Sequence, residues 1–179
     1  FGVLNYVSSH DDSTPFDGKR EKTFESATKL LLTPGTAQVY YGDESGRNLV
    51  IEGTKGDATL RSFMNWEDIK NNPITQKTLV HWQKLGQFRK NHPAIGAGVH
   101  QKISASPYVF SRSFSQENYT DQVVVGLDLA KGKKTISTGT IFQNGAKVID
   151  AYSGKESVVT HGKVTVDSEY DLVLLELKK

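Results

Sequence analysis

The chain has 179 residues, no cysteine, 16 glycines and a formal net charge of +2. This length can bury a sizeable core and fits one large or two small domains. Because the net charge is small and basic residues are not clustered, we do not expect a nucleic acid partner. No apolar stretch approaches membrane-spanning length, and no signal peptide is visible, although a fragment would have lost one.

Acidic residues follow the first apolar run of the chain. Residues 1–12 read FGVLNYVSSHDD, which predicts a short strand that leads into His10, Asp11 and Asp12. Catalytic groups occupy such a place when a barrel strand delivers them to its C-terminal mouth. The same residue types also close turns and cap helices, which is the alternative for all three.

A second apolar run ends in the same way. Residues 36–44 read TAQVYYGDE, so that Asp43 and Glu44 follow a second predicted strand. Between the two runs, apolar residues of the segment 21–32 recur every three or four positions, which predicts a helix that Pro34 terminates. A connection of this length predicts two parallel, adjacent strands joined by a right-handed crossover. Both acidic ends should then open onto the same face of an α/β unit.

The second acidic pair has more than one use. We expect Asp43 and Glu44 mainly to order their loop, by accepting backbone amides and by pairing with Arg47 or Arg61. Lining the far end of a cleft is the alternative. A further alternative is a divalent metal site formed by His10, Asp11, Asp43 and Glu44.

Four motifs occur in a fixed order within residues 1–96. They are NYVSSHD at 5–11, TPGTAQVYYGDE at 33–44, RSFMNWED at 61–68 and WQKLGQFRKNHPAI at 82–95. Together they resemble the α-amylase family, glycoside hydrolase family 13, at the seventh and eighth barrel strands, the segment that follows and the last barrel helix. The resemblance implies that residues 1–96 are the C-terminal end of a (β/α)8 catalytic barrel. A chain that starts inside a strand and lacks an initiator methionine agrees with a C-terminal fragment.

The same resemblance implies roles for two residues. Asp11 would be the carboxylate that accepts hydrogen bonds from the 2- and 3-hydroxyls of the sugar and stabilises the oxocarbenium-like transition state. His10 would bind substrate by donating a hydrogen bond to a sugar hydroxyl in the same subsite. Asp12 is expected to close a turn. In that family the nucleophile and the acid/base follow the fourth and fifth barrel strands, so we expect both to lie outside this chain.

The remaining features of the first region are expected to be structural or to set specificity. Residues 42–56 predict a long surface loop near the outer substrate subsites. Tyr40 and Tyr41 are expected to pack in the barrel, and Trp66 to contact the helix layer, with stacking on a sugar ring as its alternative.

A second long helix is expected to begin after Asn72, which would cap it. Leu79, Trp82, Leu85 and Phe88 should lie on its buried side. We expect His81 and His92 to be ordinary helix residues.

From about Gly98 the pattern changes to short β-rich runs. The runs lie at 99–105, 108–114, 122–129, 134–142, 146–154, 157–166 and 170–178. They predict an antiparallel sandwich over residues 97–179, which resembles the Greek-key domain that follows the barrel in this family. Lys131 to Lys134 should form a hairpin tip. The sandwich is expected to cap the last barrel helix, with glucan binding through Tyr108, Tyr119 or Tyr152 as the alternative.

The predicted fold is therefore a partial TIM-type α/β barrel followed by an all-β Greek-key sandwich. The resemblance implies an α-amylase-like retaining glycosidase that acts on α-glucosidic bonds of starch-type glucans or maltooligosaccharides, inactive as this fragment alone. A transglycosylase, a debranching relative, and a non-catalytic barrel homologue or glucan-binding module are the alternatives. We expect no cofactor in this chain, calcium only in the complete enzyme, and an exported rather than cytoplasmic protein. Expected partners are the α-glucan, the missing N-terminal barrel portion and a second copy of the fragment.

Overall fold

The computed structural model describes residues 2–11 and 14–178. The chain divides into two compact units, Phe1–Gln87 and Phe88–Lys179. The division falls within helix α3 (Pro73–Asn91). It precedes the sequence-based boundary between residues 96 and 97, because the last turn of α3 belongs to the same unit as the strands.

The first unit begins with a strand, a helix and a parallel strand, as the sequence predicts. Strands β1 (Leu4–Asn5) and β2 (Thr36–Ala37) pair in parallel and flank α1 (Thr23–Leu32). The paired register covers only two residues of each apolar run, so both strands are shorter than the runs. Within residues 2–11 and 14–178 these are the only parallel strands. The complete barrel therefore stays a prediction.

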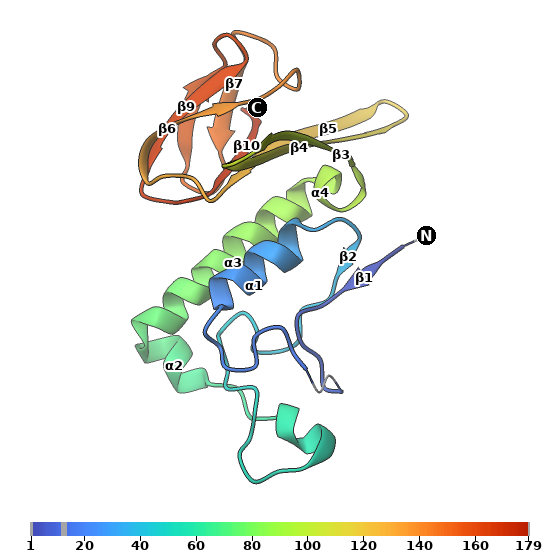
Figure 1. The fold of residues 1–179 in the computed structure, drawn as a ribbon, viewed down its shortest axis with the longest axis vertical. Coiled ribbons are helices and arrows are strands. Elements are labelled where there is room, and N and C mark those ends of the chain that lie inside the picture. Colours follow the sequence, from blue (N-terminus) through green and yellow to red (C-terminus); the bar gives the residue numbers. More distant parts are fainter. Residues whose placement is uncertain (1, 12–13, 179) are drawn as a thin grey trace. The chain divides into compact units, whose positions relative to one another are not determined.

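Three helical segments follow β2. They are the 3₁₀-helix η1 (Gly56–Leu60), α2 (Trp66–Asn71) and α3. Asn72 caps α3 as predicted, because its Oδ1 accepts a hydrogen bond from the Ile74 amide at 2.9 Å. In Figure 1, α1 runs alongside α3, and the Thr28 hydroxyl lies 3.1 Å from His81 Nε2 across that contact. His81 is thus a buried interhelical residue.

The prediction of a surface loop over residues 42–56 is wrong for its first half. Arg47 is 1% exposed and Leu49 is fully buried. Leu49 packs in a small cluster with Tyr40 and Leu60. Burial of this leucine draws the loop onto the unit, and the Arg47 guanidinium enters with it because backbone oxygens accept its hydrogen bonds.

After the last turn of α3, the second unit contains the short helix α4 (Pro93–Ala97) and two antiparallel sheets. The six-stranded sheet has the order β3-β4-β5-β10-β7-β8, and β6 pairs with β9. The bounds are β3 Val99–Ala105, β4 Tyr108–Gln116, β5 Tyr119–Leu127, β6 Gly132–Ser137, β7 Lys147–Asp150, β8 Lys155–Val158, β9 Lys163–Ser168 and β10 Val173–Leu177. Figure 1 shows both sheets.

Apolar side chains of the two sheets share one core. Val124 of β5 and Leu175 of β10 contact the same cluster as Ile136 of β6 and Val166 of β9. The core therefore lies between the sheets, as in a sandwich. Strand β10 returns to pair with β7 instead of its sequence neighbour β9, which is the long return of a Greek key. The predicted sandwich agrees with this arrangement.

Two sequence-based details of the sandwich are wrong. The run at 157–166 is not one strand, because it ends β8 and begins β9, with a turn at His161 and Gly162 between them. Both turn residues have positive φ, of 49° and 67°, which a strand does not allow. Lys134 is not at a hairpin tip. It lies buried within β6, and its Nζ donates to the Ser168 carbonyl at 2.6 Å.

Candidate active site

His10 and Asp11 lie together on the loop that follows β1. His10 Nε2 is 2.9 Å from Asp11 Oδ2, and the two side chains are 57% and 59% exposed. The Asp11 amide donates to Ser9 Oγ at 3.2 Å, which fixes the backbone at the carboxylate. Both predicted site residues are thus adjacent and accessible to a ligand. Asp12, expected to close a turn, lies outside the described residues.

The contact between His10 and Asp11 bears on what the imidazole can do. A neutral ring that donates from Nε2 to the carboxylate leaves Nδ1 as an acceptor. In this conformation a neutral His10 would accept a hydrogen bond from a sugar hydroxyl through Nδ1. Donation to the sugar, as the family resemblance implies, would need the ring to turn or to carry a second proton. The role of His10 stays a prediction.

Arg61 is the residue at this site that the sequence analysis missed. Its Nη2 lies 3.3 Å from Asp11 Oδ1, although fifty positions separate the two residues. The sequence placed Arg61 in a recognisable motif but suggested Asp43 or Glu44 as its partner. Asp11 therefore has a neighbour on each carboxylate oxygen, His10 on one and Arg61 on the other.

Asp43 has a structural position beneath the site. It is 1% exposed, accepts a hydrogen bond from Ser8 Oγ at 2.6 Å, and pairs with Arg20 at 2.8 Å. Burial raises the pKa of the Asp43 carboxyl, while the Ser8 hydroxyl and the Arg20 guanidinium act in the opposite direction. The structure supports the expected loop-ordering role, but the cationic partner is Arg20, which the sequence analysis did not consider.

Tyr40 and Tyr41 hold the segment that carries Arg61. The Tyr40 hydroxyl donates to the Leu60 carbonyl at 2.9 Å, and the Tyr41 hydroxyl donates to the Ser62 carbonyl at 2.8 Å. Tyr40 is 9% exposed, which agrees with the predicted packing role. Tyr41 is 41% exposed, and the Arg47 guanidinium lies 3.9 Å from the centre of its ring.

The expected helix-layer contact of Trp66 stays a prediction. The Trp66 side chain is 63% exposed, and α2 has no buried residue. Phe63, three positions earlier, is 99% exposed. The segment after η1 therefore presents two aromatic rings to solvent, and stacking on a ligand stays open to both.

The metal alternative finds no support among the described residues. Within residues 2–11 and 14–178, no group of three or more His, Asp or Glu side chains is placed to hold a metal ion. Asp43 is instead occupied by Arg20 and Ser8. The described residues thus do not fit a metal centre, and calcium in the complete enzyme stays a prediction.

The sandwich retains few of its candidate sugar platforms. Tyr152 is only 6% exposed and packs edge-on against Tyr170, with ring centres 4.8 Å apart. Burial, with the nearby Tyr170 and acidic side chains, raises the pKa of Tyr152 to about 12. Tyr152 is therefore a packing residue and cannot present a face to a ligand. Tyr119 is 49% exposed. The Tyr108 hydroxyl lies 3.1 Å from His100 Nε2.

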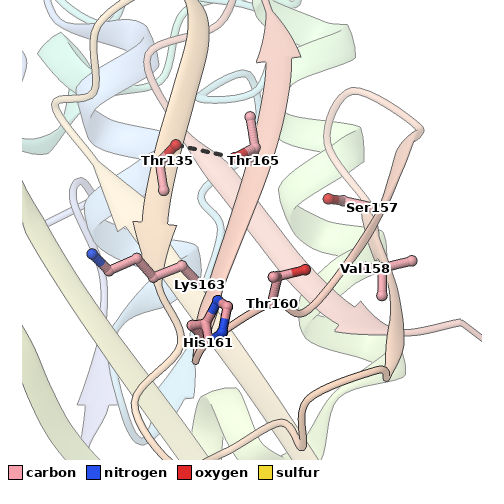
Figure 2. A pocket seen from close by; sticks show the side chains of 7 residues that line it. All are labelled: Thr135, Ser157, Val158, Thr160, His161, Lys163 and Thr165. Carbon is pink, nitrogen blue, oxygen red and sulfur yellow. Dashed lines mark hydrogen bonds between the residues drawn. The ribbon is translucent and has the colours of Figure 1, made fainter.

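A hollow on the sandwich carries mainly hydroxyl and cationic side chains. Figure 2 shows the residues around this volume of about 590 Å³, which are Thr135, Ser157, Val158, Thr160, His161, Lys163 and Thr165. The Thr135 and Thr165 hydroxyls lie 3.0 Å apart. None of the tyrosines proposed for sugar stacking lines it.

Among the described residues, no helix is long and apolar enough to cross a membrane.

Known proteins are similar to this chain over most of its length. The chain is 39% identical over 125 residues, 70% of its length, to a periplasmic alpha-amylase of Escherichia coli K12. The chain belongs to the α-amylase family and corresponds to a C-terminal part of its members. It is also 24% identical over 137 residues to a cyclomaltodextrinase from a Bacillus species. The chain spans only 17% and 23% of the length of these two relatives. No family model matches the chain.

Solved structures of the family share the fold. An alpha-amylase from Geobacillus thermoleovorans, complexed with acarbose, superposes over 99% of this chain and 40% of its own, with a TM-score of 0.66 and 16% identity. A debranching enzyme from Nostoc punctiforme superposes over 97% of this chain and 35% of its own, with a TM-score of 0.57 and 19% identity. At such identities the likeness concerns the fold alone. The resemblance to the α-amylase family that the four sequence motifs indicate is confirmed.

Proposed function

We propose that this chain is the C-terminal part of an α-amylase-like retaining glycosidase that cleaves α-glucosidic bonds of starch-type glucans or maltooligosaccharides. The observation that carries the proposal is the accessible Asp11 carboxylate, 2.9 Å from His10 and 3.3 Å from Arg61. The relative named a periplasmic alpha-amylase and two related structures complexed with maltose and maltotriose support the substrate class.

Asp11 has the chemistry that such a reaction needs from a third carboxylate. Retaining hydrolysis uses one carboxyl as nucleophile and one as acid/base, and its transition state carries positive charge on the sugar ring. A further carboxylate that accepts hydrogen bonds from the 2- and 3-hydroxyls holds the distorted ring and stabilises that charge. In the proposal the nucleophile and the acid/base come from the barrel portion outside this chain. The chain alone is then inactive.

Substitution of Asp11 in the complete enzyme tests this role. Asp11→Asn keeps the shape and removes the charge, so kcat should fall by at least a factor of about 100, which corresponds to about 2.7 kcal/mol of transition-state stabilisation, with a modest change in KM. Asp167→Asn, an exposed aspartate of the sandwich, is the matched control and should leave both constants unchanged. An Asp11→Asn enzyme that turns over maltooligosaccharides at the wild-type rate would refute the assignment.

A transglycosylase or debranching enzyme is the second candidate. A cyclomaltodextrin glucanotransferase from Geobacillus stearothermophilus is 27% identical over 140 residues, and a debranching enzyme shares the fold. Chromatography of the products from maltoheptaose and from a branched glucan distinguishes hydrolysis from transfer and from debranching. A non-catalytic relative is disfavoured because the chain retains both His10 and Asp11.

Location and assembly belong to the same proposal. The relative named as periplasmic supports an exported protein, which fractionation of the native host would test. In the complete enzyme, the rest of the barrel would cover β1 and β2, whose parallel pair would otherwise keep open edges. For the fragment alone, a second copy could cover those edges. Light scattering that finds only monomer at all concentrations would contradict self-association.

A further inference from the structure

We propose that Arg61 is the positioning residue of Asp11, and that Tyr40 and Tyr41 hold Arg61 in place. The inference rests on the proposed function, because it assigns how the Asp11 carboxylate is aimed at the sugar. Its basis is the approach of Arg61 Nη2 to Asp11 Oδ1, at 3.3 Å, together with the two tyrosine hydrogen bonds on either side of Arg61.

The carboxylate has enough acceptor sites for this arrangement. An ionised carboxylate offers about four lone-pair positions, two on each oxygen. His10 Nε2 lies at Oδ2 and Arg61 Nη2 at Oδ1, at 2.9 and 3.3 Å. Each oxygen then keeps one lone pair, and together the two can accept one hydrogen bond each from two neighbouring sugar hydroxyls. Contacts on both oxygens oppose rotation of the carboxylate about its Cβ–Cγ bond, so its plane is set before substrate binds.

Arg61 can orient Asp11 only if its own backbone is fixed. Tyr40 donates to the carbonyl of Leu60 and Tyr41 to that of Ser62, so consecutive tyrosines hold the residues immediately before and after Arg61. The Arg61 amide donates to the Ala58 carbonyl at 3.4 Å, at the end of η1. The segment is therefore attached to the residues that follow β2, and the arginine side chain extends from it toward Asp11.

The contact between Arg61 and Asp11 is suited to orientation more than to stability. The two side chains are 49% and 59% exposed, and ion pairs at such exposure contribute at most about 1 kcal/mol to folding. A bound sugar would cover them and exclude water, which strengthens the interaction where it affects the reaction. Loss of Arg61 should therefore leave folding intact and lower the chemical rate.

A double-mutant cycle in the complete enzyme tests the proposal. Arg61→Met should lower kcat about tenfold or more with KM changed less than about threefold, because a misaligned carboxylate stabilises the transition state less. Arg61→Lys should recover most of the rate, since it keeps a cation near Oδ1. In an Asp11→Asn background, Arg61→Met should cost less than about twofold more, because the two residues act as one unit. Lys77→Met, an exposed cation on α3, is the control and should leave kcat unchanged.

The outcomes separate the positioning role from the proposed function. If Asp11→Asn lowers kcat while Arg61→Met does not, the positioning role is wrong and the function of Asp11 stands. If Arg61→Met lowers kcat equally in the wild-type and Asp11→Asn backgrounds, Arg61 acts independently of Asp11 and the proposal is again wrong. If Asp11→Asn itself has the wild-type rate, the proposed function fails first. Equal melting temperatures of wild type and Arg61→Met would show that any loss of rate is not a loss of fold.

The tyrosine part has its own readout. Tyr41→Phe keeps the ring and removes the hydroxyl that binds the Ser62 carbonyl. It should lower kcat by about threefold, and this effect should disappear when Arg61 is already Met. An unchanged kcat for Tyr41→Phe, or an effect that persists in the Arg61→Met background, would remove Tyr41 from the proposal.

Discussion

Ser8 and Asp43 join the segments that follow the two parallel strands. Ser8 Oγ donates a hydrogen bond to Asp43 Oδ1 at 2.6 Å. Ser8 lies two residues before His10, and Asp43 directly follows the Tyr-Tyr-Gly segment. Arg20 completes the contact at 2.8 Å from the same carboxylate oxygen. Asp43, in the segment after the second strand, thus supports the loop that carries His10 and Asp11 from a buried position.

Removal of the Asp43 carboxylate should destabilise the chain strongly. Asp43→Ala leaves Arg20, which is 9% exposed, as a buried cation without this partner, and it leaves the Ser8 hydroxyl without its acceptor. We expect the free energy of unfolding in urea to fall by about 3 kcal/mol. Glu52→Ala, at an exposed glutamate, should cost less than about 0.5 kcal/mol. A loss for Asp43→Ala as small as that of the control would contradict the buried contact.

The raised pKa of Asp43 predicts a specific dependence of stability on pH. Because burial raises the pKa in the folded state above the usual 3.8, the folded protein favours the protonated carboxyl more than the unfolded chain does. This contribution to stability is fully present below the usual value and is lost as the pH rises through the raised pKa. Asp43→Asn, which keeps an acceptor for Ser8 and does not titrate, lacks this dependence.

The effect is measured by urea unfolding of both proteins at a series of pH values from about 3.5 to about 7, a range that begins near the usual pKa of an aspartate. The difference in free energy of unfolding, wild type minus Asp43→Asn, should decrease as the pH rises. A difference that increases with pH would show that the contacts with Arg20 and Ser8 outweigh burial and lower the pKa instead.

Asp121 should be a sensitive acidic residue of the sandwich unit. Its Oδ1 lies 2.7 Å from His92 Nδ1, and its Oδ2 accepts a hydrogen bond from the Ala94 amide at 2.9 Å. Glu176 contacts the other ring nitrogen, so His92 lies between two carboxylates and is not the ordinary helix residue expected from the sequence. Asp121→Ala leaves a buried imidazole nitrogen and a backbone N–H unpaired.

We expect Asp121→Ala to lower the free energy of unfolding of the sandwich by about 3 kcal/mol. Hydrogen exchange should show faster exchange of the α4 amides, because Asp121 holds the start of that helix. Asp167→Ala, at an exposed position on β9, provides the control. Unchanged α4 protection in Asp121→Ala would mean that the helix is held by its apolar contacts alone.

The two tryptophans predict a simple fluorescence result. Trp66 is 63% exposed and Trp82 is 4% exposed. Iodide should therefore quench only part of the emission of the chain, and Trp66→Phe should remove most of the quenchable part. If Trp66→Phe leaves the quenching unchanged, the Trp66 ring is covered in solution. That result would support the helix-layer contact expected from the sequence.

Local sequence was enough to identify the strand-helix-strand order, the Asn72 cap, the sandwich and the neighbouring pair His10 and Asp11. Each depends on periodicity or on residues close in the chain, which short-range sterics and hydrogen bonding determine. Only the tertiary structure decided that Asp43 pairs with Arg20 and that Arg61 reaches Asp11 across fifty positions. It also decided that residues 157–166 divide between two sheets and that Trp66 is exposed. Partner choice and burial depend on how distant segments meet, and alternation of residue types along the chain does not specify that.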